Sequence, residues 1–176
     1  MFGLLCAQRR VGQLHAATGR FGEPGRLLSQ GAEVNRPAPV GGETALSMAC
    51  HLGQVEVIRT LIRHGADVNR RMPSDGWETP LILAVMSKSG AIRVEMAREL
   101  IAHGANVNLR RTDHRTALDI AHLCGEEGKS ELVELLSNAG GKEMYQLAQD
   151  EGFEGLPDVC AAGLRWHWTT DSLGSA

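Results

Sequence analysis

The chain has 176 residues, of which 43% are hydrophobic and 22% charged, a composition typical of a globular protein rather than a disordered one. No apolar run approaches the length of a membrane helix, and the formal net charge of −3 gives no reason to expect nucleic acid as a partner. The four cysteines lie far apart without a C-x-x-C pair, which argues against a disulfide framework and a zinc site.

Two residue classes indicate the kind of core. Aromatic residues make up only 4% of the chain, whereas there are 21 glycines. A core poor in rings has to be built from aliphatic side chains, and frequent glycine indicates frequent ends of secondary-structure elements. The composition therefore favours short helices that are broken at regular intervals.

The first residues, MFGLLCAQRR, place a few apolar residues ahead of Arg9 and Arg10, with no basic segment before them. A secretory signal peptide has the opposite order. We therefore expect an intracellular protein, located in the cytoplasm or, in a eukaryote, in the nucleus. Residues 1–11 are predicted to be a short N-terminal lead.

Two markers then recur along the chain with a shared period. Four segments end alike, and their glycines are spaced by 34, 39 and 36 residues: SQGAEVN, RHGADVN, AHGANVN and a degenerate NAGGKEM, with Gly31, Gly65, Gly104 and Gly140. A second marker, TALSMA, TPLILA or TALDIA, begins at Thr44, Thr79 and Thr116. Chance is a poor explanation for two independent markers with one period, so the chain consists of structural repeats.

Each repeat predicts two short helices. Thr44, Thr79 and Thr116 stand where a hydroxyl caps a helix N-terminus, and Pro80 fits the first helical position. In the second repeat we expect a first helix over about 45–52, ended by Gly53, and a second over about 56–64, ended by Gly65. Helix pairs this short cannot bury their apolar faces alone, so neighbouring pairs must stack.

With Thr79-Pro80-Leu81 and Gly65-Ala66-Asp67-Val68-Asn69, these units resemble ankyrin repeats. The resemblance implies an all-α solenoid of stacked helix-turn-helix units with projecting β-hairpin-like turns. It assigns residues 12–141 to about four repeats, with boundaries near 12–41, 42–75, 76–112 and 113–141.

The repeats depart from the family pattern in places. The His that follows T-P-L in the family is Ser47, Ile82 or Asp119 here. In the first repeat, Pro24-Gly25 is expected to interrupt the second helix. The extra residues of the third repeat, around 86–92, are expected to enlarge its inter-helix loop, and the fourth repeat is stretched near 125–129.

The most enzyme-like signal is Gly128-Lys129-Ser130, the end of a phosphate-binding loop. The glycine that should open this loop is replaced by Leu123, and a helix rather than a strand is predicted ahead of it. No histidine or cysteine cluster has metal-ligand spacing. We therefore predict no enzyme, no catalytic residue, no cofactor and no metal, and keep a nucleotide-binding or enzymatic protein as the alternative.

Two asparagines suggest a modification. Asn35 and Asn69 each follow an acidic residue by two positions and a leucine by eight, a spacing that resembles substrates of asparaginyl hydroxylation among ankyrin proteins. The simpler interpretation is that each asparagine forms a turn by bonding to nearby backbone.

The family resemblance implies that a partner protein binds the inter-repeat turns and the exposed face of the first helices. Six arginines against four acids in these turns favour an acidic or mixed-charge partner, and the chain alone is expected to be monomeric. Binding of nucleic acid through the arginine edge is the further alternative. Trp77 is the preferred anchor, because Trp and Arg dominate interface hot spots. The candidate partner-binding residues are Arg36, His51, Leu52, Arg70, Arg71, Met72, Trp77, Glu78, Met86, Arg110, Arg111, His114 and Arg115.

The last segment, 142–176, differs in charge from the repeats, with six acidic and two basic residues. A helix over about 143–149 is expected to cap the last repeat. The rest is predicted to be an acidic, partly disordered tail that either masks the basic turns or carries a docking motif at Trp166-His167-Trp168.

Overall fold

The computed structural model describes residues 24–39, 41–72 and 76–150. The helices in these ranges are α2 (Pro24–Ser29), α3 (Ala45–Leu52), α4 (Val55–Arg63), α5 (Pro80–Val85), α6 (Gly90–Ala102), α7 (Ala117–Leu123), α8 (Lys129–Asn138) and α9 (Met144–Asp150). Across those same residues no strand forms, and one isolated antiparallel bridge joins Met72 to Glu78. The lead 1–11 and the Trp166-His167-Trp168 cluster lie outside the described residues.

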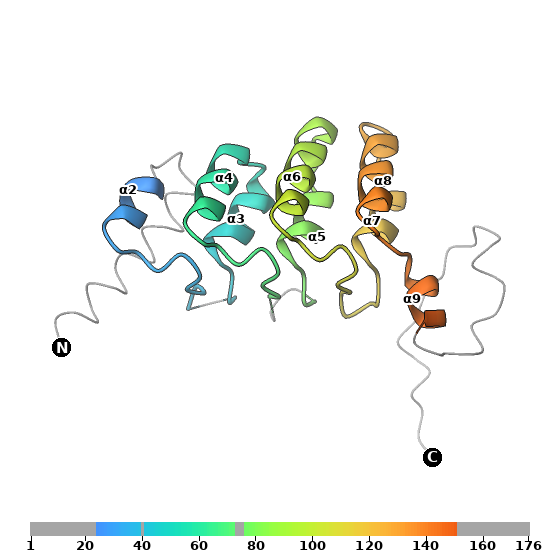
Figure 1. Cartoon of the computed structure of the whole chain (residues 1–176), viewed down its shortest axis with the longest axis horizontal. Helices are drawn as coiled ribbons and strands as arrows, with labels where there is room; N and C mark the ends of the chain where they lie inside the picture. The colour runs from blue at the N-terminus through green and yellow to red at the C-terminus, as the bar shows by residue number, and fades with distance from the viewer. Residues whose placement is uncertain (1–23, 40, 73–75, 151–176) are drawn as a thin grey trace, which may run out of the picture. The chain divides into compact units, whose positions relative to one another are not determined.

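From α3 to α8 the helices form antiparallel pairs, and together with α2 they stack in two layers. The inner helices α3, α5 and α7 contact one another in sequence, and the outer helices α2, α4, α6 and α8 do the same. Figure 1 shows α3–α4, α5–α6 and α7–α8 as successive pairs whose connecting turns project to one side. This is the stacked solenoid that the repeat period predicts.

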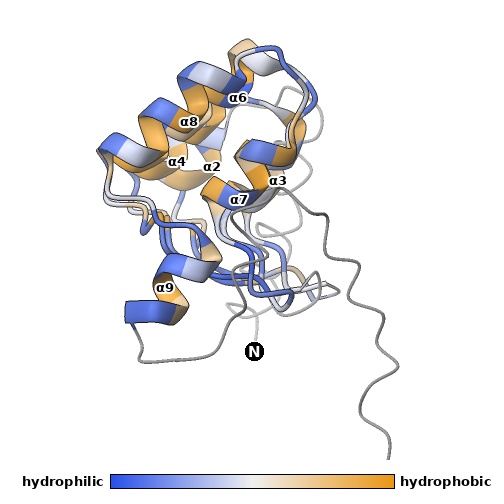
Figure 2. Ribbon diagram, turned by 90° about the vertical axis from the view of Figure 1, so that its right-hand side faces the viewer, coloured by the Kyte–Doolittle hydropathy of each residue, from blue (hydrophilic) through white to orange (hydrophobic). Residues whose placement is uncertain are grey.

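The core lies between the two layers. Figure 2 shows hydrophobic stretches, in orange, along the ribbons of both layers. The core includes Leu46, Ile58, Ile82 and Leu100, each 1% exposed or less. No aromatic residue belongs to this cluster of buried hydrophobic residues in the described ranges. The aliphatic core therefore agrees with the composition.

The helix starts are those that the threonines predict. Thr44, Thr79 and Thr116 are the N-caps of α3, α5 and α7, and each hydroxyl accepts a hydrogen bond from the backbone N–H three residues later. Pro80 occupies the first turn of α5. Gly53 ends α3 in the left-handed conformation, with φ of 72°.

The two histidines that precede a helix-ending glycine also have a local role. Nδ1 of His64 lies 2.8 Å from the carbonyl oxygen of Thr60, and Nδ1 of His103 lies 2.8 Å from that of Glu99. Because a carbonyl oxygen only accepts, Nδ1 is the donor in both rings. Each imidazole thus satisfies a carbonyl in the last turn of α4 or α6.

One local expectation is wrong and another is confirmed only in part. Pro24 begins α2 rather than interrupting a helix, because proline fits the first helical position. The extra residues of the third repeat lengthen mainly the second helix: α6 has 13 residues against 9 in α4, whereas the inter-helix loop grows only from 53–54 to 86–89. In the fourth repeat the loop is enlarged as expected, over 124–128.

The chain divides into two units, residues 1–144 and 145–176. Helix α9 begins at Met144, and its remaining residues, up to Asp150, are the described part of the second unit. A helix therefore forms near the predicted residues 143–149. Its role as a cap stays a prediction, and the acidic tail beyond residue 150 lies outside the described part of the chain.

Candidate partner-binding surface

The three turns between repeats are closed like β-hairpins. The backbone N–H of Ala38 donates to the carbonyl of Glu43 at 2.7 Å, and that of Met72 donates to Glu78 at 3.0 Å. In the third turn, Arg111 donates in the same way to Arg115 at 3.0 Å. The turns therefore have hairpin-like closure without extended strands.

A ladder of asparagines sets the spacing of these turns. The Asn69 side chain donates to the carbonyl of Gly104 at 3.0 Å and accepts from the N–H of Asn106 at 2.7 Å. Asn35 makes the equivalent pair of bonds to Gly65 and Asp67 in the following repeat. Asn35 and Asn69 thus hold successive turns in register, and their hydroxylation stays a prediction.

The predicted partner-binding residues fall into three groups by exposure. Seven are exposed: His51, Leu52, Arg70, Arg71, Trp77, Met86 and His114. Four are half-buried: Arg36, Arg110, Arg111 and Arg115. Met72 and Glu78 are buried, at 1% and 7% exposure. The prediction that these two contact a partner is therefore corrected, because their side chains are covered by the protein itself.

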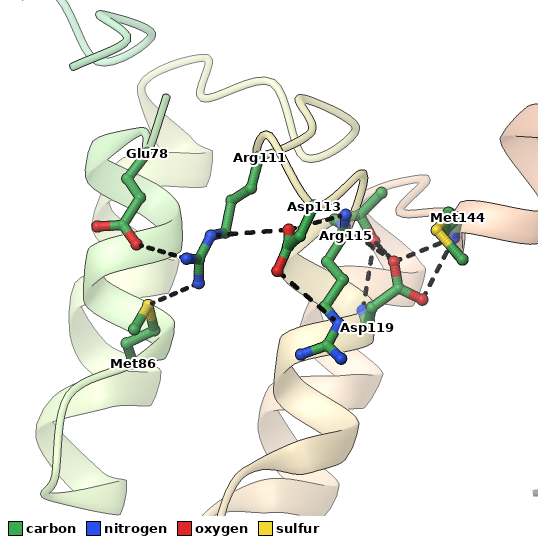
Figure 3. A network of polar contacts seen from close by, with 8 residues as sticks. Glu78, Met86, Arg111, Asp113, Arg115, Asp119 and Met144 are labelled. Atoms are coloured by element: carbon green, nitrogen blue, oxygen red, sulfur yellow. Dashed lines mark hydrogen bonds and ion pairs between the residues drawn. The ribbon is translucent and has the colours of Figure 1, made fainter. Parts of the chain in front are cut away.

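Glu78 is buried because it belongs to an ion-pair cluster centred on Arg111 (Figure 3). The Arg111 guanidinium lies 3.3 Å from the Glu78 carboxylate and 3.7 Å from that of Asp113. It also lies 3.8 Å from the sulfur of Met86. Arg111 thus joins the second and third turns, and its charge is largely balanced by carboxylates.

Trp77 lies in the second turn, directly before Glu78. Its side chain is 44% exposed, and the Arg71 guanidinium lies 5.3 Å from the ring centroid, within the range of a cation–π contact. The same guanidinium donates to the carbonyl of Arg110 in the next turn. Arg71 and Trp77 therefore form one surface feature that extends across two turns.

Exposed apolar side chains mark the ends of the inner helices. Leu52 on α3 is 46% exposed, Met86 at the end of α5 is 47% exposed, and Leu123 on α7 is 62% exposed. Leu123 is absent from the predicted set, although it follows its N-cap Thr116 by seven residues, as Met86 follows Thr79. Applying the repeat register to the third inner helix identifies it.

The Gly128-Lys129-Ser130 sequence does not form a phosphate-binding loop. Helix α7, not a strand, precedes it, and Gly128 caps the N-terminus of α8 with φ of 67°. The Lys129 ammonium lies 3.4 Å from the Glu126 carboxylate. A Cβ placed on Gly128 would lie 2.9 Å from the carbonyl oxygen of Gly90, so this glycine is explained by close packing against the third repeat.

The described residues offer neither a membrane-spanning helix nor a cluster of metal ligands. No helix there is long and apolar enough to cross a membrane. In the same ranges no group of three or more His, Cys, Asp or Glu side chains is placed to hold a metal ion.

The chain was compared with known proteins. A model of ankyrin repeats, in three copies, matches residues 14–111, which is more than half of the chain. A curated relative, the ankyrin repeat and SOCS box protein 6 of Mus musculus, is 47% identical over 45 residues. That match covers 26% of this chain and 11% of the relative, so the two proteins share a short repeat segment.

Proposed function

Because the chain belongs to the ankyrin repeat family, we propose that it is a non-enzymatic module that binds a partner protein through its turns and the exposed face of its inner helices. Ankyrin repeats are in general protein–protein interaction modules. The finer proposal is that the chain acts as an adaptor, scaffold or inhibitor, without catalysis of its own.

The row of exposed apolar side chains on the inner helices carries this proposal. Leu52, Met86 and Leu123 come from three successive repeats, and each exposes close to half of its side chain or more. Exposed apolar residues on neighbouring helices, with the Arg111 guanidinium of the third turn 3.8 Å from the Met86 sulfur, are typical of an interface with an apolar centre and a polar rim. A partner that covers the row gains the burial of three large side chains.

The turns supply the polar rim. Arg36, Arg70, Arg71, Arg110 and Arg115 lie along them, exposed or half-buried. This excess of positive charge supports an acidic or mixed-charge partner, because complementary charge raises the rate and the specificity of association. The charge of Arg111 is already balanced, which argues against nucleic acid as the ligand of this edge.

A capture experiment tests the proposal. The tagged wild-type chain and a Leu52→Asp/Met86→Asp variant are incubated with lysate of the source cells, and bound proteins are quantified by mass spectrometry. Ala102→Asp, an exposed substitution on the outer helix α6, is the matched control. We expect a partner that the wild type and the control retain and the double variant loses. Equal capture by all three chains would contradict the proposed surface.

Three further parts of the proposal have their own measurements. Light scattering of the isolated chain is expected to show a monomer. Fractionation of cells that express the tagged full-length protein is expected to place it in the cytoplasm or the nucleus. Titration with duplex DNA and with RNA is expected to show no tight binding, whereas tight, steeply salt-dependent binding would favour the nucleic-acid alternative.

A further inference from the structure

One position has a left-handed backbone in each of the three turns whose residues there are described. It lies two residues before each N-cap threonine and is occupied by Gly42, Trp77 and His114, with φ of 69°, 62° and 64°. Glycine adopts this conformation without steric cost, whereas a bulky side chain strains it. Two successive turns therefore carry a large ring where the backbone favours glycine.

Neither ring is fully buried. The Trp77 side chain is 44% exposed and that of His114 is exposed as well. Strained backbone positions are concentrated at binding sites, where the strain places a side chain for a ligand. The two rings are thus candidates for selection by a ligand rather than by stability.

The charges around Trp77 indicate which ligand fits. Among the described residues, no carboxylate lies within ion-pair distance of Arg70 or Arg71, whereas Arg111 and Arg115 have Glu78 and Asp113 close by. Arg71 is held over the indole and against the carbonyl of Arg110, so its guanidinium is preorganised. A fixed guanidinium with free donors is a favourable partner for a carboxylate.

We propose that Trp77, Arg70, Arg71 and His114 form a binding site for an extended acidic segment of the partner protein. Carboxylates of the segment pair with Arg70 and Arg71, and an apolar side chain next to them packs on the exposed part of Trp77. Adjacent repeats stack about 10 Å apart, which an extended chain spans in about three residues. The segment therefore contacts His114 about three residues from its carboxylate.

This inference rests on the proposed function and specifies the chemistry of the partner. Its decisive feature is that Trp77→Gly changes binding far more than it changes stability. The substitution relieves the left-handed strain, which offsets the packing lost with the partly buried indole, so Tm is expected to stay within about 4 °C of the wild type. The same substitution removes the packing surface and is expected to weaken binding at least tenfold.

The experiment uses the full chain and three fluorescein-labelled dodecapeptides. One peptide has glutamates three residues apart that flank leucines, and the other two carry glutamine or lysine in place of glutamate. Fluorescence anisotropy is expected to show saturable binding of the glutamate peptide alone, weakened at least tenfold by Trp77→Gly and by Arg71→Gln. Arg63→Gln, which removes an exposed arginine from the outer helix α4, is the control and is expected to leave binding unchanged.

Each other outcome overturns the inference. A lower Tm in Trp77→Gly together with unchanged peptide affinity shows that the indole has a structural role only. Equal binding of the glutamine peptide rejects the acidic ligand. If the captured cellular partner is lost in Leu52→Asp/Met86→Asp but kept in Trp77→Gly, the site is rejected and the proposed function stands. If the wild type captures no partner, the proposed function fails on its own account.

Discussion

At the scale of the residue, the N-cap threonines show how the chain compensates for departures from the family pattern. The family's His is replaced by Ser47 in the second repeat and Asp119 in the fourth. In both, the side chain accepts a hydrogen bond from the backbone N–H of the capping threonine, which completes a capping box. Ile82 has no acceptor, so the third repeat keeps only the threonine's own bond. The replacement of the family's His therefore changes the side-chain hydrogen bond at this position in the second and fourth repeats, and removes it in the third.

Asp119 in addition connects the cap to the end of the repeat array. Its carboxylate accepts from both the N–H and the hydroxyl of Thr116, at 2.8 and 2.9 Å. It also accepts from the N–H of Met144 at 3.0 Å (Figure 3). One carboxylate thus ties the start of α7 to the chain that follows Gly140.

Thr116→Ala is expected to lower the free energy of unfolding by about 1–2 kcal/mol, because it removes the hydroxyl that caps α7 and one partner of Asp119. Urea denaturation followed by circular dichroism measures the loss. Thr112→Ala, at an exposed turn position, serves as the control and is expected to change stability by less than about 0.5 kcal/mol. Equal losses in both variants would show that the cap contributes nothing specific.

Because of Cys50, we expect the free energy of unfolding to fall as the pH rises into the alkaline range. Burial raises the pKa of its thiol well above the ordinary value, because the thiolate is not solvated in the core. Below the unfolded-state pKa of about 8.5, the thiol keeps its proton in both the folded and the unfolded state, so stability does not depend on this group there. Above that pH the unfolded state loses its proton and the folded state does not. Stability therefore falls by up to about 1.4 kcal/mol per pH unit.

Urea midpoints measured between pH 7.5 and 10 test this dependence. Cys50→Ala is the matched variant: the cavity lowers its stability at every pH, but its midpoint is expected to decline less steeply above pH 8.5. The same slope in the wild type and the variant would assign the decline to other groups.

At the scale of the element, the start of α6 packs closely against the loop that precedes α8. A Cβ placed on Gly90 would lie 2.3 Å from the carbonyl oxygen of Glu127. The buried side chain of Arg93 lies beside this contact and donates to the carbonyl of Ser87 at 2.8 Å and to that of Glu127 at 3.5 Å. The loops of the third and fourth repeats are therefore packed backbone against backbone, and arginine satisfies their carbonyls.

Gly90→Ala is expected to destabilise the protein by about 1–3 kcal/mol, because the backbone of Glu127 has to move. Helix propensity alone predicts the opposite sign, a gain of about 1 kcal/mol for alanine. Gly125→Ala is the control, since a Cβ there meets nothing within 4 Å. Thermal unfolding of the three chains distinguishes the two expectations, and a stabilised Gly90→Ala would refute the close approach.

At the scale of the whole molecule, stability depends on the coupling between repeats. Each helix pair buries its apolar faces only against its neighbours, so the stack unfolds as a unit when the interfaces are strong. The outer layer adds ion pairs between successive helices: the Arg59 guanidinium on α4 lies 2.9 Å from Glu95 and 2.8 Å from Glu99 on α6. The carboxylates raise the pKa of Arg59 above its ordinary value, so this charge persists at every practical pH.

Asn69→Ala is expected to weaken the coupling by about 1–3 kcal/mol, because it removes two hydrogen bonds to the following repeat, at Gly104 and Asn106. The loss is expected to broaden the urea transition, since the repeats on either side then unfold less cooperatively. The exposed Asn138→Ala, at the end of α8, is the control. An unchanged slope and midpoint for Asn69→Ala would show that the asparagine ladder does not couple the repeats.

Much of the fold was predictable from local signals. The threonine caps, Pro80 and Gly53 mark helix ends by their own backbone chemistry, which neighbouring repeats do not alter. The length of α6 was not predictable in this way, because no local signal in residues 86–92 marks where the helix begins. In the structure residues 86–89 form the loop and the helix begins at Gly90, which packs against the loop before α8.

The candidate surface was predictable only in part, since exposure is a property of the tertiary structure. Repeat register placed Trp77 and Arg71 on the turns, and the structure agrees. It placed Glu78 there as well, although Arg111 from the next repeat covers it. The sequence by itself thus determined the period, the helix ends and the family, because each depends on residues close along the chain. Only the tertiary structure decided which charges are balanced, which rings are strained and which side chains remain for a partner, because these depend on residues one repeat apart.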